Sequence, residues 1–294
     1  MRNGGAMETQ LKRKSTFILS FQQQKLLEEL DQYQYLTASM VQKLFKINSI
    51  RTAQYRLRCL WKAGLTRQIR LYCPLGEGSK PITYMLTSFG KKYLKNEKYN
   101  NNLANNRIKD SALVRGAIQL HHLLEVNRIL ISVKTTCENE QVSMDISIPY
   151  YQRSKIEQYK LNFIPDAVFS LSRQGKQSLF FLEVDRGTEP IQSTNRERSS
   201  ISLKFDNYYQ LLKIGKFKCF GKFSGFRVLF VIPTPQRRKS LLNFAFCQKH
   251  AKCLWFTVEK ELNESNILFE KLWYVPGKSQ PHALLKQLHQ VQED

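Results

Sequence analysis

Three carboxylates in the second half of the chain have the types and spacing for chemistry on a phosphodiester. Asp166 follows Pro165 near the start of an expected strand, and the next apolar run ends with Glu183 and Asp185. Side chains two apart on a strand point to one face, so pairing of the two strands would bring the three carboxylates into one pocket. Such a pocket suits a hard divalent ion, Mg²⁺ or Mn²⁺, that activates water for attack on phosphorus.

Two other interpretations of these residues stay open. Glu183, Asp185 and Glu189 beside Arg186 also suit a structural ion-pair network at a strand end. Tyr208 and Tyr209, with the pair His121 and His122, are the residue types of a tyrosine transesterase that nicks DNA. The five histidines of the chain are too dispersed for the three-histidine metal cluster of such an enzyme. The sequence therefore favours packing or phosphate contacts for the tyrosines and a helix face for the histidine pair.

A basic helix in the first half has the chemistry to read DNA. The segment from Ser49 to Gly64 carries four polar or aromatic residues at i, i+3, i+4 and i+7, which are Arg51, Gln54, Tyr55 and Arg58. Arginine can bond guanine edges or phosphates, and glutamine can pair with an adenine edge. Leu57, Leu60 and Trp61 are expected on the buried face of the helix. The alternative is a solvated basic face on a module that contacts protein.

The elements around this helix predict a winged helix-turn-helix over residues 17–98. Helices are expected over 17–35 and 36–45, the second capped by Thr37, and β segments over 65–73 and 81–86 form a hairpin with a Gly-rich tip. Thr87 is expected to cap one more helix. Arg67, Arg70 and Lys80 on the hairpin would reach phosphates or the minor groove.

The remaining chain predicts an α/β domain over residues 110–277, in the order αβββαβ with one further αβ unit. We expect helices over 110–132, 196–213 and 235–250, and strands over 143–150, 163–172, 178–184, 226–232 and 253–258. Residues 99–109 form an Asn-rich linker, and 1–16 form a flexible basic arm. The tail 278–294 has weak helical spacing and no assignable role, and its deletion should be tolerated.

The composition points to a polyanionic partner. The chain of 294 residues has 46 Lys and Arg against 24 Asp and Glu, a formal net charge of +22. Residues 1–98 hold 18 of these basic residues against 6 acidic ones. The chain contains no apolar stretch that would span a membrane and no signal-peptide core, so we expect a cytoplasmic protein. The six cysteines form no C-x-x-C pair and are expected to be reduced core thiols.

The element order, with Pro-Asp opening one strand and acidic residues ending the next, resembles the PD-(D/E)XK nuclease fold. The motifs FIPDA (163–167), FFLEVDRGTE (180–189) and KFDNYY (204–209), behind a winged helix and HHLLEVN (121–127), look like the replication-relaxation family of plasmid and mobile-element proteins. The resemblance covers about residues 17–258. It implies a role in replication or relaxation of a mobile element, with duplex DNA and replication or mobilisation proteins as partners.

One departure from the nuclease pattern affects the chemistry. The position two residues after Glu183, where the pattern has Lys, is Asp185, so the cation that stabilises charge on the reacting phosphate is missing there. Lys204 could supply that cation from the following helix, and Glu125 could add a further ligand. The catalytic set implied by the resemblance is therefore Asp166, Glu183, Asp185 and Lys204.

The sequence thus predicts an α+β protein, a winged helix followed by a nuclease-like domain, with two functional hypotheses. The first is a DNA-binding replication or mobilisation factor, in which a metal-dependent endonuclease or nickase activity is an open question. The alternative is a transcriptional regulator whose second domain dimerises or senses a ligand. The first expects Asp166, Glu183 and Asp185 to converge on a metal, and the second expects them apart or neutralised by Arg186.

Overall fold

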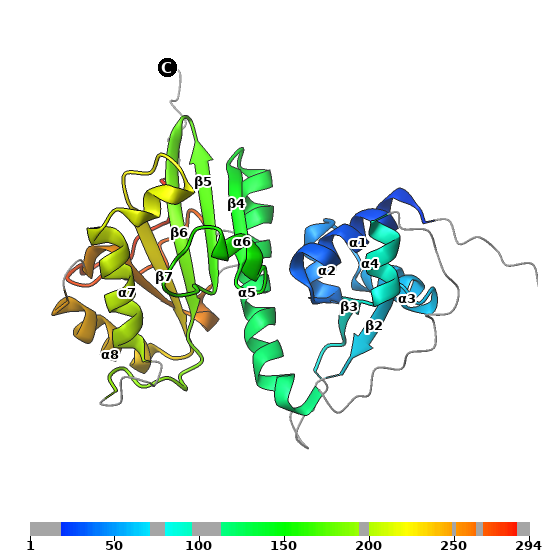
Figure 1. The fold of residues 1–294 in the computed structure, drawn as a ribbon, viewed down its shortest axis with the longest axis horizontal. Helices are drawn as coiled ribbons and strands as arrows, with labels where there is room; N and C mark the ends of the chain where they lie inside the picture. The colour runs from blue at the N-terminus through cyan, green and yellow to red at the C-terminus, as the bar shows by residue number, and fades with distance from the viewer. Residues whose placement is uncertain are drawn as a thin grey trace, which may run out of the picture.

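The computed structural model is a mixed α/β protein with two sheets (Figure 1). The structure describes residues 19–70, 80–95, 113–193, 200–248, 251–262 and 267–286. We call residues 19–95 the N-terminal module and residues 113–286 the C-terminal unit. The expected arm (1–16) and linker (99–109) lie outside the described residues.

Side-chain caps set the starts of the helices in the N-terminal module. Helix α1 (Phe21–Tyr33) begins with a capping box between Ser20 and Gln23. The hydroxyl of Thr37 accepts a hydrogen bond from the Met40 amide at the start of α2 (Ala38–Leu44), which confirms the predicted cap. Helix α3 (Ile50–Lys62) follows a short turn and ends just before Gly64, whose φ of 74° is one that glycine adopts without strain.

A small antiparallel sheet completes the N-terminal module. Strand β3 (Thr83–Leu86) lies between β1 (Leu36–Thr37) and β2 (Thr66–Ile69), so the predicted hairpin pairing is confirmed with shorter strands. Helix α4 (Ser88–Leu94) then begins at the predicted cap, Thr87. The hairpin tip, 71–79, lies outside the described residues.

The large sheet of the C-terminal unit has the order β4-β5-β6-β7-β8. Its strands are β4 (Ser143–Pro149), β5 (Ala167–Arg173), β6 (Lys176–Val184), β7 (Phe226–Ile232) and β8 (Leu254–Val258). The first three pair antiparallel, and β6, β7 and β8 pair parallel. The predicted order of strands and main helices is confirmed, but β5 begins at Ala167, so Asp166 directly precedes the strand.

Helices cover both faces of this sheet (Figure 1). Helix α5 (Leu113–Asn139), longer than predicted, covers one face, and α7 (Ile201–Lys213) and α8 (Pro235–Phe246) cover the other. Short helical segments α6 (Arg153–Glu157), η3 (Lys216–Phe220), η4 (Ala251–Cys253) and η5 (Glu259–Glu261) fill connections. Side chains alternate along β6, so Phe180 and Leu182 face α5, whereas Phe181 packs beside Tyr208 of α7.

Helix α5 stands between the large sheet and the N-terminal module and joins them (Figure 1). The buried Asn127 donates from Nδ2 to the carbonyl oxygens of Tyr33 and Tyr35, 2.8 Å each, and accepts a hydrogen bond from the Tyr151 hydroxyl. One apolar core continues from the N-terminal module through α5 to the sheet. The module is therefore packed onto the C-terminal unit, in addition to being connected to it by the chain.

The first part of the expected tail, residues 278–286, packs against the core. Leu284 is 3% exposed, and the backbones of His282 and Trp273 exchange two hydrogen bonds. Arg173 of β5 also donates to the carbonyl oxygen of Lys286. Weak helical spacing did not predict this packing, because the segment packs as an irregular chain.

The described cysteines are free thiols, of which Cys137 is buried, Cys59 and Cys253 are half-buried, and Cys219 and Cys247 are exposed. The expectation of core thiols therefore fits only part of the set. Within the part of the chain that the structure describes, no helix combines the length and apolar character needed to cross a membrane.

Candidate functional site

Helix α3 presents a basic outer face. Ala53, Leu57 and Leu60 are fully buried in the core of the N-terminal module, so the opposite side of the helix faces solvent. The four predicted DNA-reading residues are all exposed: Arg51, Gln54, Tyr55 and Arg58. Trp61, predicted to be buried, is 45% exposed, because it lies one helical step away from the buried stripe.

Another arginine of α3 points elsewhere. Arg56 is half-buried and donates from Nη1 to the side-chain oxygen of Gln22 near the start of α1, at 3.4 Å. The outer basic face of α3 therefore includes Arg51 and Arg58, with Gln54 and Tyr55 between them, and the exposed Lys62 lies one turn after Arg58.

A hollow of about 380 Å³ adjoins this face, between α2, α3 and the start of β3. Gln54 and Arg58 line it together with apolar side chains, among them Ile50 and Ile82. The polar groups predicted to read DNA thus lie at a concave part of the surface.

The hairpin residues are presented unequally. Arg70 is exposed and Lys80 is half-buried. Arg67 is also half-buried, and its Nε donates to Sδ of Met85 on the neighbouring strand at 2.9 Å. Of the three predicted hairpin contacts, Arg70 is the most accessible to a phosphate.

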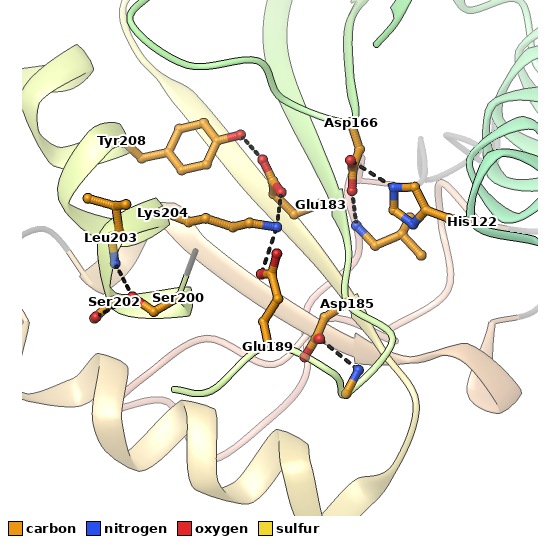
Figure 2. A network of polar contacts seen from close by, with 12 residues as sticks. His122, Asp166, Glu183, Asp185, Glu189, Ser200, Ser202, Leu203, Lys204 and Tyr208 are labelled. Carbon is orange, nitrogen blue, oxygen red and sulfur yellow. Dashed lines mark hydrogen bonds and ion pairs between the residues drawn. The ribbon is translucent and has the colours of Figure 1, made fainter. Parts of the chain in front are cut away.

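Glu183 lies at the end of β6 on the face covered by α7 (Figure 2). Its side chain is only 4% exposed, accepts a hydrogen bond from the Tyr208 hydroxyl at 2.6 Å, and lies 3.0 Å from Lys204 Nζ. Burial raises the pKa of Glu183 to about 7, although the Lys204 ammonium opposes this rise. Burial and the neighbouring Glu183 carboxylate raise the pKa of Tyr208 well above its ordinary value, which fits its role as a hydrogen-bond donor to Glu183.

Lys204 connects two carboxylates. Ser200 caps α7 by accepting a hydrogen bond from the Leu203 amide, and this start places Lys204 in the first turn, opposite Glu183. Lys204 Nζ lies 3.0 Å from Glu183 Oε2 and 3.1 Å from Glu189 Oε2 (Figure 2). Burial lowers the pKa of Lys204, but the attraction of Glu183, Asp166 and Glu189 outweighs it and raises the pKa above its ordinary value. Lys204 is therefore a cation held within the acidic site.

Asp166 is held from two sides (Figure 2). One carboxylate oxygen accepts a hydrogen bond from the Val184 amide at 2.7 Å, and the other lies 2.9 Å from Nε2 of His122 on α5. Its neighbour His121 is exposed. The sequence shows the histidine pair but does not predict the contact between His122 and Asp166, because the two residues lie 44 positions apart.

Asp185 is turned toward α8. Its carboxylate accepts hydrogen bonds from the Gly187 amide, at 2.8 Å, and from Nε of Arg237, and it is only 1% exposed. Nη2 of Arg237 donates in turn to the carbonyl oxygen of Glu189 at 2.6 Å. Arg237 reaches Asp185 because α8 begins beside the end of β6, and Arg186 is exposed in the loop that follows the strand.

This arrangement does not fit the predicted metal pocket. No group of three or more His, Cys, Asp and Glu side chains in the described ranges is placed to hold a metal ion. Asp185 is paired with Arg237, Glu183 with Lys204, and the proposed extra ligand Glu125 with Arg128 at 2.9 Å. The three carboxylates lie near one strand end, but protein cations and donors already bind them.

Comparison with known proteins identifies the family. The model of the replication-relaxation family matches residues 27–223, which include α3, Asp166, Glu183 and Lys204. No curated protein and no solved structure matches the chain. The matched segment spans most of the chain and contains the motifs at 121–127, 163–167 and 180–189 on which the sequence resemblance rests. The chain belongs to the replication-relaxation family.

Proposed function

We propose that this chain is a DNA-binding protein that acts in the replication or mobilisation of a plasmid or other mobile element. In this proposal the N-terminal module is a winged helix that docks on duplex DNA, with α3 in the major groove and the β2–β3 hairpin beside it. Membership of the replication-relaxation family favours this role over that of a transcriptional regulator.

The observation that carries the proposal is the outer face of α3. Arg51, Gln54, Tyr55 and Arg58 are all exposed on one helix, whereas its apolar residues Leu57 and Leu60 are fully buried. Such a helix carries hydrogen-bond donors for the acceptor atoms of guanine, adenine and phosphate. Its exposed face can reach these atoms from solvent. The net charge of +22 supplies long-range attraction to the same partner.

The test is the affinity of the full chain for a mixed-sequence duplex, measured by fluorescence anisotropy across a salt series. The double variant Arg51→Ala/Arg58→Ala should bind roughly tenfold more weakly or worse. The slope of the logarithm of the binding constant against the logarithm of salt concentration should become shallower by about one for each lost phosphate contact. The control is Lys91→Ala/Lys92→Ala on α4, which removes the same charge from another exposed surface. Equal loss in both double variants would mean that only net charge matters.

DNA cleavage by the C-terminal unit is a second candidate. One observation favours it: Lys204, from the helix after β6, lies 3.0 Å from Glu183 and so supplies a cation near the position that the nuclease pattern requires. Nicking of supercoiled plasmid by the purified chain with Mg²⁺ or Mn²⁺, lost in Asp166→Ala, would establish this activity. The pairing of Asp185 with Arg237 is the reason that binding is the first candidate and cleavage the second.

A further inference from the structure

We propose that the ammonium group of Lys204 takes the place of a divalent metal ion in the acidic site, so that Asp166 and Glu183 hold no metal in this chain. The nuclease-like order of elements raises the expectation of a metal, and the contacts around the carboxylates argue against it. The inference concerns the C-terminal unit and is independent of DNA binding by α3. It argues against metal-dependent cleavage, the second candidate function.

The position of the ammonium group is the first argument. Lys204 Nζ lies 3.0 Å from one oxygen of Glu183 and 3.1 Å from one oxygen of Glu189, so it bridges two carboxylates as a metal ion would. Glu183 is 4% exposed and Lys204 is 23% exposed, so water screens this contact only weakly. A divalent ion bound to the same Glu183 oxygen would lie within a few ångströms of the ammonium and would be repelled by it.

The second argument is that the carboxylate oxygens around Lys204 already accept hydrogen bonds or ion pairs. The other oxygen of Glu183 accepts the Tyr208 hydroxyl, and the two oxygens of Asp166 face the Val184 amide and His122. A metal ion would have to compete with each of these partners for its ligands. Mg²⁺ in particular requires a nearly regular octahedron of oxygen ligands, which a site fixed by four protein groups adjusts to poorly.

The third argument is that Asp185, the remaining carboxylate of the predicted set, is bound by other protein groups. Nε of Arg237 and the Gly187 amide bind its two oxygens, and it is directed toward α8. Arg237 also donates to the carbonyl oxygen of Glu189 and so fixes the loop that carries the second carboxylate beside Lys204. Two protein cations, Lys204 and Arg237, thus bind the acidic side chains that a metal would need.

Manganese binding tests this inference on the full chain without DNA. Free Mn²⁺ is measured by electron paramagnetic resonance as the wild-type chain, Lys204→Met and Lys213→Met are titrated into it. We expect no Mn²⁺ bound at the acidic site of the wild type, and about one ion per chain bound by Lys204→Met, whose neutral side chain of similar length removes the ammonium beside Glu183 and Glu189. Lys213→Met removes the same charge from the exposed end of α7 and should bind none there.

Two results would overturn the inference. One is stoichiometric Mn²⁺ binding by the wild type that is lost in Asp166→Asn. The other is a folded Lys204→Met variant, with a cooperative circular dichroism melt, that binds no more Mn²⁺ than the wild type. If Lys204→Met does not fold, the wild-type and Asp166→Asn titrations decide the question alone. None of these measurements depends on DNA binding, so failure here and failure of the proposed function are distinguishable.

Discussion

Glu183 is a carboxylate whose environment in the folded protein differs strongly from that in an unfolded chain. It is buried, it accepts the Tyr208 hydroxyl, and its pKa is raised to about 7 from an ordinary value of 4.5. The folded protein therefore retains this proton up to about pH 7, whereas the unfolded chain releases it near pH 4.5. The stability contributed by Glu183 is full below pH 4.5 and is lost as the pH rises to 7.

The variant Glu183→Gln should reveal this loss. We expect the free energy of unfolding of the wild type, relative to that of Glu183→Gln, to fall between pH 4.5 and pH 7, because glutamine does not titrate. Urea unfolding at several pH values measures it. Asp206→Asn, which removes an exposed carboxylate from α7, is the control for the loss of one negative charge. A difference between wild type and Glu183→Gln that stays constant or grows with pH would contradict the assignment.

At the scale of single residues, the sequence predicted the positions of the site residues better than the side chains that contact them. The positions of Asp166, Glu183 and Lys204 near one strand end followed from strand alternation and from the motifs. The partners His122 and Arg237 did not, because they come from α5 and α8, and single-sequence periodicity does not show which helix end lies beside which strand. Asp185 illustrates the consequence: it has the predicted location, but Arg237 gives it a structural contact.

The elements were predictable where a local signal sets them. Thr37 and Thr87 cap the helices that they were expected to cap, and the turn through Gln174 and Gly175 joins β5 and β6 with the positive φ angles typical of a tight hairpin. The packing of segment 278–286 was not predicted, because its weak helical spacing does not show that an irregular chain packs against the core.

Truncation tests the importance of that segment. A chain ending at Gly277 loses buried Leu284 and the backbone bonds between His282 and Trp273. Burying a leucine contributes about 1.5 to 3 kcal/mol, and each hydrogen bond about 0.5 to 1.5 kcal/mol. We therefore expect a free energy of unfolding lower by several kcal/mol, measured by urea denaturation. A chain ending at Lys286 keeps all these contacts and is the control. Equal stability of the two chains would show that the packing of 278–286 contributes nothing.

At the scale of the whole molecule, α5 makes the N-terminal module and the C-terminal unit one packed body. Asn127 binds two carbonyl oxygens of the module, Lys134 pairs with Glu29 at 2.7 Å, and one apolar core includes residues of both parts. The composition predicted two units and a basic charge, but it contained no signal that the two units share a core. In the proposed binding mode, this packing would present α3 to DNA in one orientation relative to the large sheet.

Photo-crosslinking tests most directly whether α3 is the surface that meets DNA. Tyr55 of α3 and Phe246 of α8 are exposed aromatic residues, 67% and 65% exposed, so each accepts replacement by benzoylphenylalanine without disturbing the core. Illumination of the full chain bound to a labelled duplex should give a protein–DNA crosslink from position 55 and none from position 246. A crosslink from position 246 alone, or none from position 55 although the duplex is bound, would contradict the assignment of α3 as the DNA-reading helix.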